Sequence, residues 1–373
     1  MDIIIVGGGV VGTLQAWEAI DHGHNVVQIE REPEARGASV RNFGLVWTSG
    51  RDKGAESRAA TRSRELWEKI SLLVDGVGFR NCGSMTLART DAEVAVAEAA
   101  AKDDEVGERF TVLEPDEVRK VNPLLQGDFK AGLWCPGDAA VESRQALPAL
   151  RAHMGATGRY RWLKGREVRD AGTGWVRDDQ GRRHEGDQVL LCTGAWHSGL
   201  VREMAGEIPV RRVRLQMMQT APLMEKVSTA VANADSFRYY PAYRSPELEE
   251  LVESEPQSDT AAAHRMQLLA VQRLDGSLTI GDTHEYEEPF GFDVTEDAYD
   301  ELRREIESLF GRELPPTRRR WAGVYSQLAD PDGEELLLRK EVVDGVWLLT
   351  GPGGRGLTMA PYFAHQSSLD LNW

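Results

Sequence analysis

The stretch IIIVGGGVVG, residues 3–12, decides the fold of this chain. Its four leading apolar residues, bounded by glycine, predict a buried parallel strand. The glycines that follow have the spacing GxGxxG: Gly7 allows a tight turn, Gly9 lets the backbone approach a pyrophosphate, and Gly12 lets the next helix pack close to the strand. The N–H groups of that helix then face the diphosphate. The stretch therefore predicts a dinucleotide-binding unit of the Rossmann type.

The residues that follow complete this unit. A helix is expected over residues 10–22, and a second short apolar strand over residues 26–29. Glu30 ends that strand, 18 residues after Gly12, where a carboxylate can accept the ribose hydroxyls and repel a 2′-phosphate. A plain glycine turn of another α/β protein is the alternative. The order of strand, glycine turn, helix, strand and acid argues against it.

Two further glycine-rich segments help to distinguish FAD from NAD. Residues 36–44, RGASVRNFG, form a polar loop beyond the second strand and offer backbone donors to an extended cofactor. Residues 351–356, GPGGRG, follow a buried strand at 346–350 and precede a helix start, which can hold negative charge on a reduced flavin. Either segment alone could be an ordinary loop. Together they favour FAD, because an NAD domain has no need of the second.

The residues expected to contact FAD lie in these segments and just after the buried strand at 189–192. They are Gly7, Gly9, Val10, Val11, Gly12, Glu30, Arg31, Ala38, Ser39, Arg41, Asn42, Phe43, Gly44, Thr193, Gly194, Trp196, Gly353, Gly354, Arg355, Gly356, Leu357 and Thr358. Neither cysteine nor histidine occurs between Asn25 and Cys82 or between Val342 and Ala364. The flavin-contacting loops therefore offer no tether, and we expect the FAD to be bound non-covalently.

The strand-to-glycine turns are spread over the whole chain, which predicts an α/β fold with a discontinuous Rossmann-type FAD-binding domain of residues 1–80, 141–212 and 335–373. Residues 81–140 and 213–334 are expected to form an inserted α+β substrate-binding domain on a mostly antiparallel sheet. Residues 246–263 are acidic and poor in apolar side chains, and we interpret them as a solvated surface insertion of undetermined role.

Composition narrows the possible partners. The net charge of −16 argues against nucleic acid and anionic membranes. The three cysteines have no metal-ligand spacing, so no metal site is expected. With no run of 18 apolar residues and no secretory leader pattern, the protein is expected in the cytoplasm. These patterns leave the oligomeric state open.

Several of these motifs together resemble the D-amino-acid oxidase family of flavoproteins, which includes glycine oxidase and sarcosine oxidase. The resemblance rests on the GxGxxG with its acid, on LLCTGAW at 190–196 and on GPGGRGLTMAP at 351–361. Residues 321–323 (WAG) and 281–283 (GDT) look like further family landmarks. The sequence is most similar to a bacterial subgroup associated with aminophosphonate breakdown.

The resemblance implies a reaction. Hydride passes from the carbon beside a neutral amine to flavin N5, water hydrolyses the imine, and the reduced flavin is reoxidised, usually by O2 to peroxide. The alternatives are an amino-acid, glycine or sarcosine oxidase, or a dehydrogenase that passes electrons to a quinone or a carrier protein. A flavin-binding protein in RNA modification is a third alternative, against which the acidic charge weighs.

One departure from the glycine oxidase pattern concerns the substrate. In those relatives an arginine that grips the substrate carboxylate follows the Trp-Ala-Gly-hydrophobic stretch, and here that position is Tyr325. A phenol cannot replace the bidentate guanidinium. We therefore expect a small anionic or zwitterionic amine whose acid group is not an α-carboxylate, with an aminoalkylphosphonate the leading candidate. Arg355 is the first candidate for the anion, and Arg41, Tyr325 and His284 follow.

Two groups of ring-bearing side chains could either line the substrate pocket or have a purely structural role. His284 could face the substrate, although we favour the interpretation that it is a loop or strand-end histidine satisfied by hydrogen bonds. Tyr239, Tyr240 and Tyr243 could wall the pocket or pack in the core.

Overall fold

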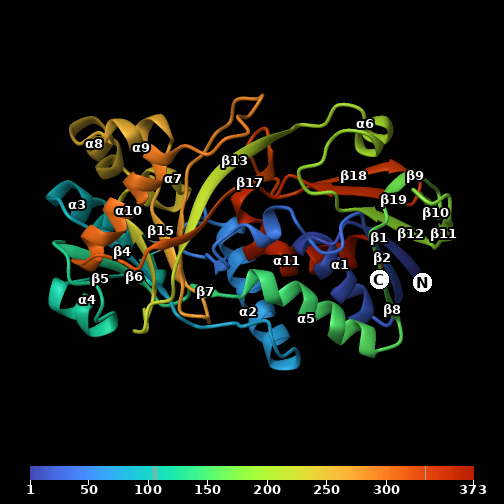
Figure 1. Ribbon diagram of the computed structural model, residues 1–373, viewed down its shortest axis with the longest axis horizontal. Coiled ribbons are helices and arrows are strands. Elements are labelled where there is room, and N and C mark those ends of the chain that lie inside the picture. The colour runs from blue at the N-terminus through green and yellow to red at the C-terminus, as the bar shows by residue number, and fades with distance from the viewer. Residues whose placement is uncertain (104, 106, 332) are drawn as a thin grey trace.

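A computed structural model describes residues 1–373 except 104, 106 and 332. Two large sheets lie at opposite ends of an elongated molecule (Figure 1). The first has the order β18 (Leu338–Val343), β19 (Val346–Thr350), β12 (Gln188–Leu191), β1 (Asp2–Val6), β2 (Asn25–Glu30) and β8 (Tyr160–Lys164). Its strands run parallel except β18, and they all lie within the segments expected to form the FAD-binding domain.

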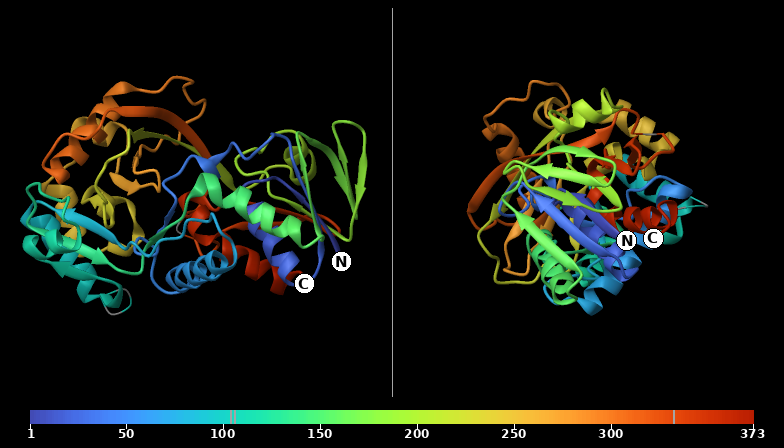
Figure 2. Two further views of the ribbon diagram at one scale, coloured as in Figure 1. Left: turned by 60° about the horizontal axis from the view of Figure 1, so that its bottom comes forward. Right: turned by 90° about the vertical axis from the view of Figure 1, so that its right-hand side faces the viewer.

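Both faces of this sheet are covered, which explains why β1 is apolar at every position after Asp2. Ile3 and Ile5 pack toward the helices, and Ile4 and Val6 pack on the other face against the small antiparallel sheet. Figure 2 shows the helices grouped beside the strands. They are α1 (Val10–Asp21), α2 (Ala55–Leu73), α5 (Ser143–Ala156) and α11 (Gly356–Asp370). The small sheet consists of β9 (Val168–Gly172), β10 (Trp175–Asp178) and β11 (Arg183–Glu185).

The second sheet is mostly antiparallel, as the sequence predicts. Its order is β17 (Thr317–Leu328), β13 (Val210–Thr220), β16 (Leu278–Gly281), β15 (Leu269–Gln272), β14 (Ala230–Asn233), β4 (Ser84–Ala88), β6 (Ala131–Cys135) and β5 (Thr111–Leu113). Only β14 and β4 pair in parallel among the described strands of this sheet. The strands β3 (Leu45–Val46) and β7 (Ala139–Ala140) form a separate antiparallel pair. In the sequence, each of them stands between a strand of one large sheet and a strand of the other.

The two faces of this second sheet have different roles. One face packs on the amphipathic helix α10 (Glu296–Phe310), which inserts Tyr299, Leu302 and Ile306 into a core with Met85. The other face carries Leu215, Met217 and Tyr325 toward the FAD-binding domain. The remaining helices are α3 (Asp91–Lys102), α4 (Pro115–Val121), α6 (Leu200–Ala205), α7 (Asp235–Tyr239), α8 (Pro246–Ser254) and α9 (Asp259–Ala263). Short 3₁₀ turns are η1 (Ala38–Val40), η2 (Gly107–Arg109), η3 (Pro241–Tyr243) and η4 (Gly353–Arg355).

The acidic segment 246–263 is largely solvated, as expected, but it also forms the helices α8 and α9. Each begins at a serine whose hydroxyl caps it: Ser245 accepts from the N–H of Leu248, and Ser258 from that of Ala261. Leu251 is fully buried and joins α8 to the core of the second sheet. A single apolar residue per turn was enough to dock an otherwise acidic helix.

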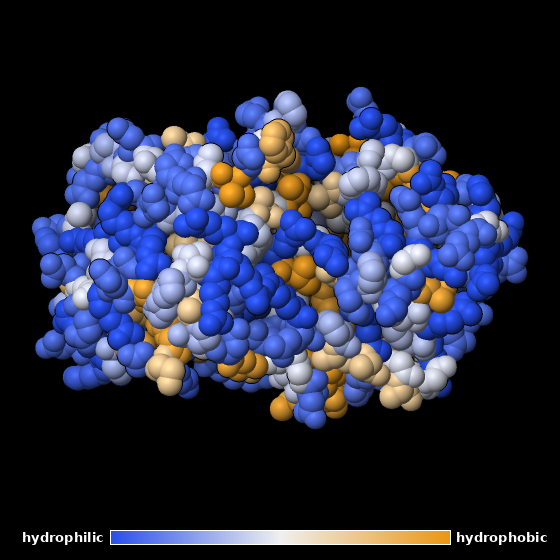
Figure 3. Space-filling view, viewed as in Figure 1, coloured by the Kyte–Doolittle hydropathy of each residue, from blue (hydrophilic) through white to orange (hydrophobic). Residues whose placement is uncertain are grey.

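Hydrophilic residues cover both ends of the face shown in Figure 3, and hydrophobic ones gather near its centre. None of the helices in the described residues combines the length and the apolar character needed to cross a bilayer.

Candidate active site

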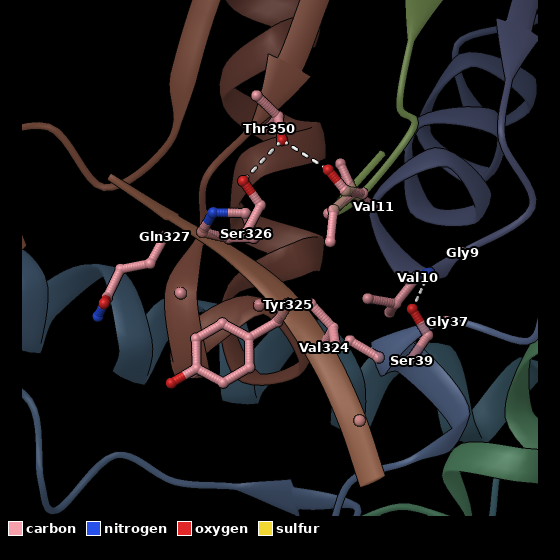
Figure 4. Close-up of a pocket in the computed structure, with 18 of the residues that line it drawn as sticks. Gly9, Val10, Val11, Gly37, Ser39, Val324, Tyr325, Ser326, Gln327 and Thr350 are labelled. Carbon is pink, nitrogen blue, oxygen red and sulfur yellow. Dashed lines mark hydrogen bonds between the residues drawn. The ribbon is translucent and has the colours of Figure 1, made fainter. Parts of the chain in front are cut away.

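A cavity of about 1140 Å³ runs between the two domains and is lined by residues of both. This volume exceeds the roughly 300–1,000 Å³ typical of small-molecule pockets, so it offers room for a dinucleotide and a substrate together. One end is formed by the glycine loop after β1 and the other by residues of β15 and β17 and by Asp282, just after β16. Figure 4 shows part of its wall, with Tyr325 and Gln327 projecting from one side of β17.

The glycine loop has the geometry that the sequence predicts. Gly7 has φ +112°, and a Cβ there would lie 2.2 Å from the carbonyl oxygen of Cys192. A Cβ on Gly12 would lie 2.3 Å from the carbonyl oxygen of Gly7, so helix α1 can approach β1 only with glycine at that position. Gly9 is the N-cap of α1 and provides no side-chain cap. The first turn of α1 therefore presents N–H groups to an anion in the cavity.

The loop of residues 36–44 is fastened to the glycine loop and to β17. Ser39 Oγ accepts the N–H of Val10 at 2.9 Å (Figure 4). Asn42 donates from Nδ2 to the carbonyls of Ala38 and Ser39, which shapes the turn. Arg41 Nη1 donates to the carbonyl of Ala322 at 2.7 Å. These contacts hold the loop along the cavity, and they engage Arg41 with backbone.

Glu30 lies at the end of β2, where an adenosine ribose is expected. Its Oε2 accepts the N–H of Gly8 at 2.7 Å, and its Oε1 accepts that of Glu32 at 3.0 Å. The carboxylate is thus fixed against the glycine loop before any ligand arrives. Nearby, the guanidinium of Arg31 stacks on the ring of Trp196 at 4.1 Å. Both residues line the same end of the cavity.

Most of the residues expected to contact FAD line the cavity, and Gly12 and Gly44 do not. Gly12 serves the close packing of α1 described above. Gly44 has φ +79°, and a Cβ there would lie 2.1 Å from the carbonyl oxygen of Val141. Both glycines support the cavity wall by letting backbone segments approach each other.

Arg355 lines the cavity, but its guanidinium is already engaged. Nη1 lies 3.1 Å from Oε1 of Glu56, and Nη2 donates to the carbonyl of Pro331 at 3.0 Å. Arg51, which the sequence did not single out, lies 3.8 Å from the same oxygen of Glu56. Both guanidinium groups are buried in the wall.

The far end of the cavity is aromatic. The ring of His284 stacks on that of Tyr239 with centroids 4.3 Å apart, and its Nδ1 contacts the carbonyl oxygen of Arg265 at 3.0 Å. Burial lowers the pKa of His284 to about 4, so its ring is neutral at neutral pH. Burial raises the pKa of Tyr325 and Tyr239 well above the usual range, so their hydroxyls stay protonated. This end can therefore donate hydrogen bonds to a ligand.

Sequence reasoning missed several residues of this wall. They are Trp47, Arg51, Gln267 and Asp282. Asp282 stands in a stretch noted as a family landmark, but no pattern in the sequence showed that its side chain faces a cavity. The others come from segments that read as ordinary strand or loop.

Besides Nε of Arg238, which is ion-paired with Asp235 at 3.5 Å, three buried polar atoms in this wall make no hydrogen bond within the described part of the chain. They are Nε1 of Trp47, Oε1 of Gln267 and the hydroxyl of Tyr325, which lies beside Tyr239 without a well-aligned bond. A buried polar group without a partner costs roughly 1–3 kcal/mol. Their gathering in one cavity therefore fits a bound ligand that supplies the missing partners, and the start of α1, whose N-cap Gly9 has no side chain, fits its diphosphate.

Comparison with known proteins agrees with this geometry. The chain matches the family described as FAD dependent oxidoreductase over residues 2–367. This chain belongs to that family. It is 26% identical to glycine oxidase from Pseudomonas aeruginosa over 384 aligned positions, which cover 96% of this chain and 91% of that protein.

Two solved structures show the same fold as this oxidoreductase. Glycine oxidase from Bacillus cereus superposes with a TM-score of 0.78 at 18% identity, covering 100% of this chain and 95% of that one. L-α-glycerophosphate oxidase from Mycoplasma pneumoniae, solved with FAD bound, has a TM-score of 0.76 at 18% identity, with 100% and 94% covered. The protein is thus an FAD-dependent oxidoreductase with a Rossmann-type domain and a substrate domain inserted into it.

Proposed function

We propose that this protein oxidises a small amine that carries an anionic group other than an α-carboxylate, with an aminoalkylphosphonate as the leading candidate. The proposal rests on family membership, on amine-oxidising relatives such as glycine oxidase, and on Tyr325 in the wall of the cavity. Tyr325 stands where an arginine is expected to grip a carboxylate. Its buried hydroxyl can give one hydrogen bond, which suits one oxygen of a tetrahedral anion.

The anion needs a cation, because an unpaired charge out of water costs several kcal/mol. Arg355 and Arg51 both approach Glu56, and the contact of Arg355 is the shorter, at 3.1 Å against 3.8 Å. Arg355 is therefore the closer partner of Glu56, and Arg51 also donates from Nε to the Trp47 carbonyl at 2.9 Å. We propose that this pair of arginines receives the anionic group, with Tyr325 and His284 as uncharged donors.

The residues of the chain bind, orient and protect the substrate. FAD, when bound, supplies the acceptor for the hydride that leaves the carbon next to nitrogen. The glycine loop would hold its diphosphate, Glu30 its ribose, and the start of α11 its flavin ring. The apolar side chains of β13 and the stacked rings of Tyr239 and His284 exclude bulk water from the reacting carbon. Water then hydrolyses the imine product after it leaves this wall.

An anaerobic screen tests the proposal directly. The purified holoprotein is mixed with 2-aminoethylphosphonate, its N-methyl and 1-hydroxy forms, glycine, sarcosine and D-alanine, and bleaching of the flavin band is followed. We expect an aminophosphonate to bleach the flavin fastest. Faster bleaching by glycine, sarcosine or D-alanine would contradict the substrate class and leave amine oxidation itself standing.

Variants of the two arginines sharpen the screen. Each charge-assisted contact is worth about 1.5–3 kcal/mol. Arg355→Ala and Arg51→Ala should therefore each lower kcat/KM by about tenfold to a hundredfold. Arg58→Ala, which changes an arginine of α2 outside the cavity, is the control and should leave kcat/KM unchanged.

The electron acceptor and the attachment of the cofactor are part of the same proposal. We propose O2 as the acceptor, and peroxide release during aerobic turnover tests it; flavin reduction without peroxide would favour a carrier protein. The cysteine and histidine in the cavity wall are Cys192, whose pKa burial raises to about 12, and the neutral His284. Neither is activated as a nucleophile, so acid should release the FAD. Flavin that stays with the denatured chain would contradict this.

A further inference from the structure

A buried carboxyl group lies in the substrate end of the cavity and has no role in the function proposed so far. Asp282 follows β16 directly and is only 5% exposed. Its N–H donates to the carbonyl of Gln267 at 2.8 Å, and its own carbonyl accepts the N–H of Gln267 at 3.2 Å. This pair of backbone bonds fixes Asp282 against the segment before β15, with its side chain in the cavity wall.

The carboxyl has weak partners within the chain. Gln267 Nε2 lies 3.4 Å from Oδ1, and His284 Nε2 lies 4.0 Å from the same oxygen. Among the described residues, no arginine or lysine lies within ion-pair distance of it. Burial raises the pKa of Asp282 to about 8, and the Gln267 amide opposes that rise.

The other titratable groups that face Asp282 hold one protonation state near neutral pH. They are His284, Tyr239, Tyr240, Tyr286 and Tyr325. Burial lowers the pKa of the histidine to about 4 and raises the pKa of every one of these tyrosines. Asp282 is therefore the group of this cluster that can exchange a proton near neutral pH.

Tyr240 has Arg51 over its ring and is connected to Asp282 through Gln267. The guanidinium of Arg51 lies 5.8 Å from the ring centroid, and the hydroxyl lies 3.3 Å from Nε2 of Gln267, which contacts Asp282. Arg51 lowers the pKa of the Tyr240 hydroxyl, and Asp282 raises it. When Asp282 is deprotonated, this wall carries a positive and a negative group, and a molecule with an anion at one end and an amine at the other matches it.

Oxidation of an amine at carbon requires the nitrogen lone pair, yet a simple amine is an ammonium ion near neutral pH. The proton must leave before hydride transfer, inside a site that excludes water. A carboxylate in the wall without a cation of its own both attracts the ammonium and can accept the proton.

We infer that Asp282 receives the ammonium group of the substrate and takes its proton, which makes it a catalytic residue of the reaction proposed above. In this step one N–H bond of the ammonium breaks and one O–H bond forms on the Asp282 carboxyl. No electrons are transferred, and the nitrogen keeps the pair that later supports loss of hydride. The inference rests on the proposed amine oxidation.

Asp282→Asn tests it, because the amide keeps the shape but cannot accept the proton. Flavin bleaching by 2-aminoethylphosphonate is followed anaerobically across the pH range around 8. We expect the wild-type rate to fall as the pH drops through the pKa of Asp282. In the variant the rate should be about a hundredfold lower at neutral pH. It should recover at high pH, where the free amine enters ready for oxidation.

Binding supplies a second readout that does not depend on turnover. Ethylphosphonate lacks the amine, and its Kd is measured from the shift of the flavin spectrum. Asp282→Asn should leave this Kd unchanged within about twofold, since the anionic end is untouched. Loss of ethylphosphonate binding together with activity would show a structural role and overturn the inference. Asp300→Asn, an exposed change on α10, is the matched control and should behave as wild type.

The outcomes separate this inference from the proposed function. If no amine bleaches the wild-type flavin, amine oxidation fails. If an amine bleaches wild type and Asp282→Asn alike, with the same pH dependence, only the role of Asp282 fails. If Asp282→Asn does not retain FAD, the wild-type pH profile alone decides, because a rate independent of pH around 8 would overturn the role of Asp282.

Discussion

The two ends of the cavity are built in different ways. At the diphosphate end, backbone groups from a few consecutive residues do most of the work: Gly7, Gly9 and Gly12 position the first turn of α1. At the substrate end, side chains come from α7, β17 and the segments around β15 and β16. The first end depends on local conformation, and the second on how distant segments meet.

The ends also differ in how their buried polar groups are satisfied. Near the glycine loop, Tyr160 donates from its hydroxyl to Gln28 Oε1 at 2.7 Å, and Gln28 donates to the Gly7 carbonyl at 2.8 Å. At the substrate end, Tyr325 and Gln267 keep buried atoms without a partner in the described chain. The Tyr160–Gln28–Gly7 chain of hydrogen bonds is therefore complete within the protein, whereas Tyr325 and Gln267 are left for a ligand to pair.

The largest expected effect comes from breaking the backbone geometry of the first end. Gly12→Ala places a Cβ 2.3 Å from the Gly7 carbonyl oxygen, so α1 must move away from β1. We expect loss of most bound FAD and of about 1–3 kcal/mol of stability, measured as flavin-to-protein ratio and as Tm. Gly155→Ala is the control, because nothing lies within 4 Å of its Cβ position in α5. Full FAD retention in Gly12→Ala would show that the loop tolerates displacement.

A side chain at the same end should have a smaller effect. Glu30→Ala removes the carboxylate that accepts the Gly8 N–H, and with it the expected ribose contact. The Kd for FAD should rise by about tenfold to a hundredfold, since a charge-assisted hydrogen bond is worth about 1.5–3 kcal/mol. Glu30→Gln keeps an acceptor and should lose less. Equal retention of FAD in all three proteins, by equilibrium dialysis, would refute the ribose contact.

At the substrate end, Asp282 should make the stability of the protein depend on pH. The folded-state pKa of Asp282 lies above its ordinary value of 3.8, at about 8. Its contribution to stability is therefore present below 3.8 and is lost as the pH rises through about 8. Asp282→Asn removes this loss. The Tm of the variant relative to that of the wild type should therefore be higher by a few degrees in alkaline buffer than in acidic buffer. His284 changes stability with pH in the opposite direction, but it is present in both proteins and cancels from the difference in Tm. A difference in Tm that stays constant with pH would contradict the raised pKa of Asp282.

The smallest effect is expected for removal of the Tyr325 hydroxyl, and Tyr160 near the glycine loop serves as the comparison. Tyr160→Phe leaves Gln28 Oε1 without its donor and should cost about 1–3 kcal/mol. Tyr325→Phe removes a hydroxyl that makes no hydrogen bond in the described chain, so its stability should stay within about 0.5 kcal/mol of wild type or rise. Urea denaturation of the substrate-free proteins measures both. Equal losses would mean that the two ends are satisfied alike.

The sequence predicted the elements that local chemistry controls. The strand at 3–6, the helix from residue 10, the strand ending at Glu30 and the strand before the last glycine loop are all confirmed as β1, α1, β2 and β19. It did not predict that the acidic segment 246–263 would fold into two helices, because docking through Leu251 needs a partner surface that no local pattern shows.

The sequence by itself determined the cofactor end and the family, because the GxGxxG turn depends on local features: the positive φ of Gly7 and the close approach that Gly12 allows. Only the tertiary structure decided the substrate end. It joined Arg355 to Glu56, turned Arg41 to the Ala322 carbonyl, and brought Asp282 and Tyr240 into one wall. Those outcomes depend on which side chains meet across segments far apart in the chain, and no spacing within the sequence encodes such a meeting.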